Sequence, residues 1–174
     1  MYAAETRAAG VEVSAPAKED TLLWRRIVEP IEPFLDAVAQ VLAEQVETFE
    51  PEIIPYARYA LTNQGKQLRP ALVALSTAAV DPLSDPKRRD VVKAATVIEM
   101  VHLATLVHDD VMDEASVRRR RPTLAVNWGN QISVLLGDCL FAHALKLAAS
   151  FPSTEVCRAV SEATKTVCSG EILQ

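Results

Sequence analysis

A long apolar segment that ends in a cluster of acidic residues is the feature that most limits how this chain can fold. The pattern predicts one helix over about residues 88–114, and the middle of that helix is apolar on nearly every side. A helix that is hydrophobic all round is stable only where neighbouring helices cover each of its faces. The segment therefore predicts a helical bundle with this helix at its centre.

The remaining periodicity indicates an all-α fold. Apolar residues recur at three- and four-residue steps from Thr21 to Val46, on both sides of a proline-broken turn at 29–33. Further helices are expected over 53–63, 70–80 and 131–150, and from 153 or 154 to Gln174. Residues 117–128 are expected to form a basic loop. We therefore expect long, mostly antiparallel helices packed around the central one.

Composition supports this fold and limits the function. Only 5 of the 174 residues are glycine, which disfavours a β-sandwich with its glycine-rich turns. The formal net charge of −5 disfavours a nucleic-acid-binding protein, because such proteins are usually basic. Residues 1–20 lack an apolar period and are expected to form a flexible tail, so residues 21–174 are expected to form the folded part.

Several features bear on the compartment in which the chain works. The cysteines Cys139, Cys157 and Cys168 lack the spacing of a disulfide framework or a zinc site, which favours reduced thiols. The N-terminus lacks the cationic start and apolar run of a secretory signal. The longest apolar stretch, 91–107, is interrupted by charged residues and predicts no transmembrane segment. We expect a cytoplasmic protein, and the sequence leaves contact with a membrane surface open.

Acidic residues at the end of the central helix form the first candidate site. Residues four and seven apart share a helical face, so His102, Asp109 and Asp113 are expected on one stripe. Two carboxylates one turn apart suit Mg²⁺, which takes one or two carboxylates and completes its shell with water and phosphate oxygens. The alternative interpretation is an acidic helix end that is merely solvated.

Two cationic segments form the second candidate site. Arg118 to Arg121 closely follow the acidic cluster, and Lys66 and Arg69 lie three residues apart between two predicted helices. Arginine binds phosphate groups through bidentate hydrogen bonds, so acids beside these cations suit a metal–diphosphate complex. Taken singly, the arginine run could be solvated or bind nucleic acid, and residues 65–70 could be an ordinary connecting loop.

Together these segments resemble the trans-isoprenyl diphosphate synthases, which form the polyprenyl synthetase family. Asp109-Asp110-Val-Met-Asp113 matches the first aspartate-rich motif of that family, DDxxD, and residues 65–70 match its GKxLRP loop. Arg118 and Arg119 match the arginine pair that follows the aspartates. The resemblance covers roughly residues 30–174, and it includes the segments VNWGN, LLGDCLFA and SGEILQ at 126–130, 135–142 and 169–174.

The resemblance implies an isoprenoid-synthase bundle and a prenyltransferase that condenses isopentenyl diphosphate with an allylic diphosphate. It implies that Asp109 and Asp113 bind Mg²⁺ at the allylic diphosphate, with Asp110 as a supporting catalytic residue. Arg118 would contact the same allylic diphosphate. The diphosphate of isopentenyl diphosphate would be held by Lys66, Arg69, His102 and Arg119.

Small side chains before the aspartates bear on product length. Ala104 and Thr105 lie about one turn before Asp109, where short-chain members of the family often carry a bulky aromatic residue. We expect both residues to line the pocket for the prenyl tail. The absence of a large side chain there predicts a product longer than farnesyl.

The sequence departs from the family pattern in two places. Arg120 stands where the family usually has glycine, and it would be strained if this position requires a positive φ. No second aspartate-rich motif is present, so the chain corresponds to about the first half of a family member. We expect a homodimer or a complementary second half. The alternative is a truncated, non-catalytic homologue or a subunit that only binds substrate or regulates.

Two other helical classes share parts of this pattern. Glu99-Met-Val-His102 fits the Glu-x-x-His pattern of ferritin-like di-iron proteins, but those need a second such pair and further glutamates. A terpene cyclase shares the aspartate-rich helix but has no use for a second diphosphate site. Lys66 and Arg69 therefore argue against a cyclase.

Overall fold

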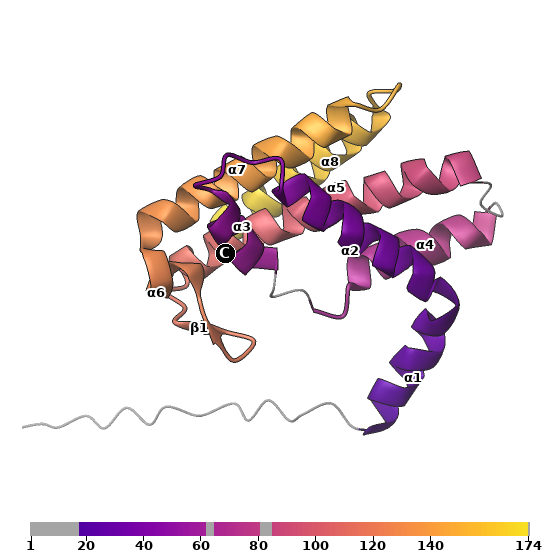
Figure 1. The fold of residues 1–174 in the computed structure, drawn as a ribbon, viewed down its shortest axis with the longest axis horizontal. Helices are drawn as coiled ribbons and strands as arrows, with labels where there is room; N and C mark the ends of the chain where they lie inside the picture. The colour runs from indigo at the N-terminus through magenta and orange to yellow at the C-terminus, as the bar shows by residue number, and fades with distance from the viewer. Residues whose placement is uncertain (1–17, 62–64, 81–84, 174) are drawn as a thin grey trace, which may run out of the picture. The chain divides into compact units, whose positions relative to one another are not determined.

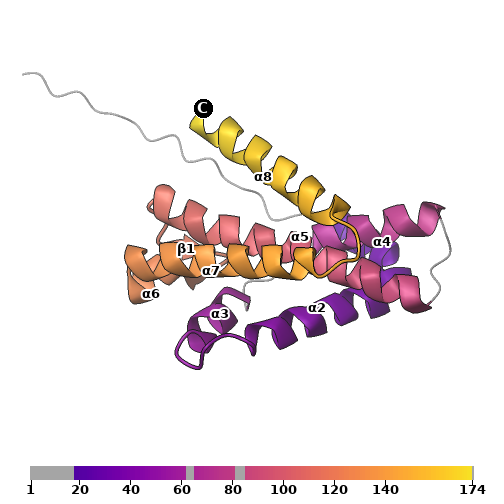
Figure 2. The same cartoon turned by 90° about the horizontal axis from the view of Figure 1, so that it is seen from above.

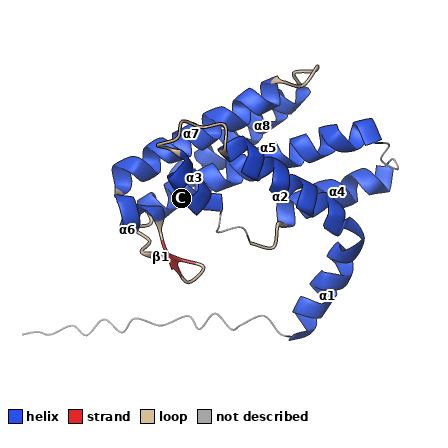
Figure 3. Cartoon of the chain, in the orientation of Figure 1, coloured by secondary structure: helices blue, strands red, loops and turns tan. Residues whose placement is uncertain are grey.

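The computed structural model describes residues 18–61, 65–80 and 85–173, and most of them are helical (Figure 3). The chain divides into two units, of which the first ends at Pro30 and the second begins at Ile31. Helix α1, Lys18–Val28, lies in the first unit. Most of the tail expected over residues 1–20 lies outside the described residues, and its last three residues belong to α1.

The second unit is a bundle of helices, which confirms the expected all-α fold (Figure 1). After a 3₁₀ turn, η1 (Glu29–Ile31), the helices are α2 (Glu32–Val46), α3 (Ile54–Leu61), α4 (Leu68–Val80), α5 (Asp85–Met112), α6 (Leu124–Trp128), α7 (Asn130–Ala149) and α8 (Glu155–Ile172). Pro33 lies in the first turn of α2, where its missing N–H costs no helical hydrogen bond. The long helices begin and end within about three residues of their predicted bounds.

Helix α5 occupies the centre of this unit, as its apolar composition predicts. It packs against α2, α4 and α7, and Figure 2 shows α7 running back alongside it. Ala95, Val97 and Met100 of α5 are almost fully buried. Burial on several sides fixes the position of α5, so the acidic residues at its end are held on a rigid element.

Two helical segments, Arg88–Met112 and Asn130–Ala149, are long and apolar enough to cross a membrane by length and composition. These segments belong to α5 and α7, which pack against each other. Helices in the core of a bundle show the same composition because their neighbours bury their apolar surface. The packing of α5 on α7 thus accounts for much of the apolar character.

The basic segment after α5 differs from the expected loop. It contains a two-stranded antiparallel hairpin, β1 (Val117–Arg118) and β2 (Arg121–Pro122), and then α6. Arg119 and Arg120 form the two-residue turn with φ angles of 51° and 66°. Positive φ at both positions is the geometry of a type I′ hairpin turn. Strands of two residues are too short to produce a detectable alternation of polar and apolar side chains.

Candidate active site

A cavity of about 690 Å³ lies beside the acidic end of α5. Its walls come from α5, α7 and α8, with Arg69 contributed by the first turn of α4. Three other residues singled out from the sequence line it: His102, Thr105 and Asp109. This volume lies within the range of small-molecule sites in proteins, about 300–1,000 Å³. The cavity is therefore large enough for a ligand with an extended apolar part.

Asp109 is the carboxylate of the aspartate-rich motif that lines this cavity, which Asp138 and Glu171 also line. Burial raises the pKa of Asp109, and the negative charges of Asp113, Glu171 and Asp110 raise it further, whereas Arg118 lowers it. Asp113 is exposed and does not line the cavity, but its charge acts on Asp109 from one helical turn away. Excess negative charge around a half-buried carboxylate favours the binding of a cation.

The donor set at this end of α5 fits Mg²⁺ held partly by a ligand. In the described part of the chain, no group of three or more His, Cys, Asp or Glu side chains is arranged to hold a metal ion. Mg²⁺ needs no such group, because it is commonly bound through one or two carboxylates plus phosphate oxygens. Asp109 and Asp113 can supply those two carboxylates, and the open cavity beside Asp109 leaves room for the phosphates.

Asp110 points away from the large cavity and holds the hairpin instead. It is 6% exposed, and Arg118 Nε donates a 2.6 Å hydrogen bond to its Oδ1. The sequence grouped Asp110 with the catalytic aspartates and expected Arg118 at the allylic diphosphate. In the structure neither lines the large cavity, and this ion pair ties the start of the hairpin to α5.

His102 lies at the centre of the cationic side of the site. Burial lowers the pKa of His102 to about 4, and the positive charges of Arg69, Arg119 and Arg118 contribute to the shift. The imidazole is therefore neutral near pH 7 and can donate one hydrogen bond to an anion. The three arginine charges that act on the His102 ring come from α4 and from the hairpin, two segments that are distant in sequence.

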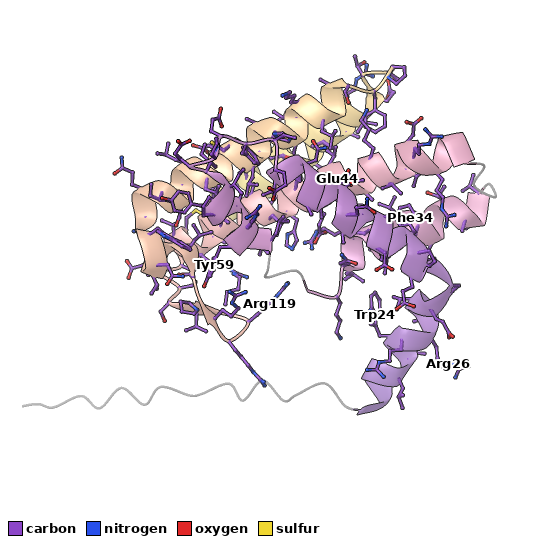
Figure 4. The ribbon with its side chains drawn as sticks, in the orientation of Figure 1. Trp24, Arg26, Phe34, Glu44, Tyr59 and Arg119 are labelled. Atoms are coloured by element: carbon purple, nitrogen blue, oxygen red, sulfur yellow. The ribbon has the colours of Figure 1, made fainter. Side chains whose placement is uncertain are left out.

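Gly65 permits the close approach of the hairpin to the segment that leads into α4. A Cβ added at Gly65 would lie 2.6–2.7 Å from the guanidinium atoms of Arg119, which stands at the hairpin turn (Figure 4). This contact brings together the two cationic segments that the sequence predicted as one site. Lys66, the next residue, is exposed and does not line the cavity.

The two residues expected to line the prenyl pocket lie on different sides of α5. Thr105 lines the cavity, and its hydroxyl donates a 2.9 Å hydrogen bond to the carbonyl of His102. Ala104 is 1% exposed, belongs to the packed core and does not line this cavity. Successive helical residues point about 100° apart, which separates these neighbours.

Sequence reasoning missed the contribution of Glu171 and left the role of His108 undecided. Glu171 of α8 lines the cavity opposite α5, and its charge raises the pKa of Asp109. His108 Nε2 lies 3.1 Å from the carbonyl oxygen of Val134 and 3.4 Å from Oδ1 of Asp138, both on α7. No helical period places residues of two separate helices together, so the sequence held no signal for these contacts.

Comparison with known proteins gives these residues a family context. The model of the polyprenyl synthetase family matches residues 50–174. The chain is 33% identical over 148 residues to an all-trans-nonaprenyl-diphosphate synthase (geranyl-diphosphate specific) of Rhodobacter capsulatus. The matched region covers 85% of this chain and 45% of that protein. The chain is also 32% identical over 140 residues to heptaprenyl diphosphate synthase component 2 of Bacillus subtilis (strain 168). That match covers 80% of this chain and 39% of the other protein.

The fold is also that of solved structures in this group. The polyprenyl synthase from Caulobacter crescentus CB15, complexed with calcium and isoprenyl diphosphate, matches with a TM-score of 0.79 at 30% identity. That match covers 87% of this chain and 45% of the other. The chain thus spans less than half the length of these relatives.

Proposed function

Because this chain belongs to the polyprenyl synthetase family, we propose that it carries the diphosphate-binding part of a prenyltransferase. The proposed reaction is the condensation of isopentenyl diphosphate with an allylic diphosphate to give a longer polyprenyl diphosphate. One observation carries the proposal: a carboxylate site at Asp109 and a cation cluster around His102 lie on one cavity-facing side of α5. Two anions that must react side by side need such a division of charge.

The acidic end of α5 would bind the allylic substrate. Asp109 and Asp113 would hold Mg²⁺, which when bound neutralises the charge that develops on the leaving diphosphate. Asp110 would act through Arg118, which it holds by their ion pair. The positive charge of Arg118 would thereby stay close to Asp109 and the diphosphate.

The cationic side would bind isopentenyl diphosphate. Arg69 and His102 line the cavity, Arg119 acts on His102, and exposed Lys66 lies three residues before Arg69. Guanidinium groups bind diphosphate oxygens through paired hydrogen bonds. A neutral imidazole adds a donor without adding to the repulsion among the arginines.

The bound arrangement would assist the reaction by charge and by alignment. The allylic C–O bond breaks, and its electron pair leaves with the diphosphate. The double bond of isopentenyl diphosphate then attacks the allylic cation, and loss of a proton restores an alkene. The residues of this chain would hold both diphosphates side by side and so place the reacting carbons together.

We propose that the prenyl tail runs along α5, away from the aspartates, and that the product is longer than farnesyl. A second cavity, of about 200 Å³, is lined by α5, α8 and Arg69 of α4, and it shares Arg69, His102, Thr105 and Val167 with the first. It reaches Ile98, which is eleven residues before Asp109 and so about 16 Å along the helix. Beyond Arg69 and His102 the lining is mostly apolar, with Ile98, Val101 and Val160, and this part of the cavity supports a long tail.

The complete enzyme is proposed to need a second polypeptide segment, either a complementary half with another aspartate-rich motif or a second copy of this chain. The chain spans 45% of one relative, and another is named as one component of a synthase. Val167 and Ile172 of α8, and Leu173 just after it, expose apolar side chains that such a partner would cover. The free thiols of Cys139, Cys157 and Cys168 support a cytoplasmic location.

Calorimetric titration of this chain with an allylic diphosphate, with and without Mg²⁺, tests the proposed function. We expect binding that requires Mg²⁺ and that Asp109→Asn weakens at least tenfold. Arg69→Gln should weaken the binding of isopentenyl diphosphate but leave allylic binding within twofold. Metal-independent binding that Asp109→Asn leaves unchanged would contradict the assignment.

A further inference from the structure

Glu99 is a buried carboxylate that the proposed reaction does not yet use. It lies in the middle of α5 and is 4% exposed. Its Oε2 is buried and, among the residues that the structure describes, has no hydrogen-bond partner. A buried carboxylate oxygen without a donor is costly, so its presence in the core of the bundle requires a compensating interaction.

The compensating charges are those of the proposed isopentenyl diphosphate site. Burial raises the pKa of Glu99, whereas the positive charges of Arg69 and Arg119 lower it. The same two arginines act on His102, which lies three residues further along α5 and therefore on nearly the same helical face. Glu99 therefore lies one helical turn before His102, which lines the large cavity together with Arg69. The guanidinium group of Arg119 lies against Gly65, four residues before Arg69.

The geometry of a guanidinium group explains how Glu99 could serve that cluster. Arginine has five N–H donors on more than one edge, so one edge can bind a carboxylate while another binds phosphate oxygens. Arg69 comes from α4 and Arg119 from the hairpin turn, and both have long side chains with many rotamers. A single anion behind both side chains would direct their donors and reduce their mutual repulsion.

We propose that Glu99 is a positioning residue that holds Arg69 and Arg119 in place to receive the diphosphate of isopentenyl diphosphate. This inference rests on the proposed function and assigns Glu99 no contact with substrate. In the sequence, Glu99 and His102 resemble half of a di-iron motif. Under this proposal they serve diphosphate binding instead of iron binding. His102 faces the anion, and Glu99 supports the cations beside it.

Equilibrium dialysis of this chain with labelled isopentenyl diphosphate, without an allylic primer, tests the proposal, because no condensation occurs under those conditions. We expect Glu99→Gln to raise the dissociation constant about tenfold. The dissociation constant for magnesium-dependent binding of an allylic diphosphate should stay within twofold, because Asp109 lies ten residues further along the helix than Glu99. Glu44→Gln on α2, whose carboxylate accepts a hydrogen bond from Gln40, is the matched control and should change neither constant.

The alternatives give different results. If Glu99 served only folding, Glu99→Gln would weaken both ligands equally and lower the unfolding temperature. If it only repelled anions, the variant would bind isopentenyl diphosphate more tightly. Either result, or an unchanged constant, would overturn the proposal. Should Glu99→Gln fail to fold, Glu99→Asp keeps the charge but withdraws it by one methylene, and it should weaken isopentenyl diphosphate alone at least threefold.

The wild-type chain separates this inference from the function on which it rests. If it binds isopentenyl diphosphate and Glu99→Gln binds equally well, only the positioning role is wrong. If the wild-type chain binds neither isopentenyl diphosphate nor inorganic pyrophosphate, the cationic side is not a diphosphate site and both proposals fall.

Discussion

Single side chains at this site have pKa values that burial and neighbouring charges shift. Burial lowers the pKa of half-buried His102, and three arginine charges lower it further. Burial raises the pKa of Asp109, and nearby carboxylates raise it further, whereas Arg118 opposes the shift. Both shifts disfavour the charged form of the group. A bound diphosphate would supply negative charge near His102, and a bound cation would supply positive charge near Asp109. The site is thus electrostatically complementary to a metal–diphosphate complex.

The low pKa of His102 should make folding stability depend on pH. The pKa is about 4 in the folded chain and about 6.5 in the unfolded chain. Between these values the unfolded chain binds more protons, so stability should fall as the pH drops from about 6.5 to about 4, by at most about 1.4 kcal/mol per pH unit. His102→Gln should lack this component in urea unfolding curves. The raised pKa values of Asp109 and Glu99 act in both proteins and cancel in the difference, and parallel pH profiles would contradict the prediction.

The backbone at Arg120 gives a second prediction at this scale. Its φ of 66° is a conformation in which the Cβ of an L-residue crowds the backbone. Arg120→Gly should therefore stabilise the chain by about 1 kcal/mol, measured as the midpoint of chemical unfolding at constant m-value. Arg120→Ala removes the charge but keeps the Cβ, so it should not stabilise. Equal effects of the two variants would show that charge, and not backbone strain, is the cause.

At the scale of helices and strands, the sequence predicted one part of the site and missed another. The apolar composition of α5 predicted the central helix, and the seven-residue spacing predicted that His102 and Asp109 share one helical face. The periodicity could not separate Ala104 from Thr105, because an all-round apolar helix does not show which side meets the cavity. The hairpin escaped notice because its strands have two residues each. The contact between Gly65 and Arg119 joins distant segments, so only their family resemblance paired them.

The packing of α5 on α7 depends on one glycine. A Cβ added at Gly137 would lie 2.2–2.9 Å from ring atoms of His108. Gly137→Ala should therefore destabilise the chain by about 1–3 kcal/mol through overpacking. Combining it with His108→Ala, which removes the ring, should cost less than the sum of the two single changes. Additive free energies in a double-mutant cycle of unfolding would contradict this reason.

The two sides of α5 should respond differently to a large side chain. Thr105→Phe places a ring in the cavity and should shorten the product of a complete, reconstituted enzyme. Ala104→Phe places the same ring in the packed core and should destabilise the chain by about 1–3 kcal/mol. Product chain length by thin-layer chromatography and the unfolding midpoint separate the two effects. A shortened product from Ala104→Phe in a stable protein would show that the tail passes on that side.

At the scale of the whole molecule, the described helices supply only part of the charge that the proposed reaction needs. The chain spans 45% of one relative and holds a single aspartate-rich motif. Helix α8 forms one wall of the cavity, and Ile172 at its end and Leu173 just after it are exposed to solvent. An experiment on this chain alone should therefore detect substrate binding without comparable catalytic turnover.

We expect this chain alone to bind substrates but to condense them very slowly. Each missing contact to the leaving diphosphate is worth roughly 3–4 kcal/mol, or about two to three powers of ten in rate. The measurement is incorporation of labelled isopentenyl diphosphate with an allylic primer and Mg²⁺, by the chain alone and with a separately expressed segment that carries a second aspartate-rich motif. Turnover by the chain alone at ordinary enzyme rates, lost in Asp109→Ala, would show that one motif suffices, for example in a homodimer.

The tie between Asp110 and Arg118 has a consequence for how such a site can be transferred and altered. Thr123 Oγ1 donates a 2.7 Å hydrogen bond to the carbonyl of Ala115, so both ends of the hairpin are fastened next to the end of α5. The aspartates, the arginine pair and His102 therefore occupy one continuous stretch of about twenty residues, whose internal spacing is set by its own covalent chain. Such a stretch can be transferred as a unit: grafted onto another apolar helix, it would keep the distance between its acidic and cationic groups. A single residue inserted within it would change that distance.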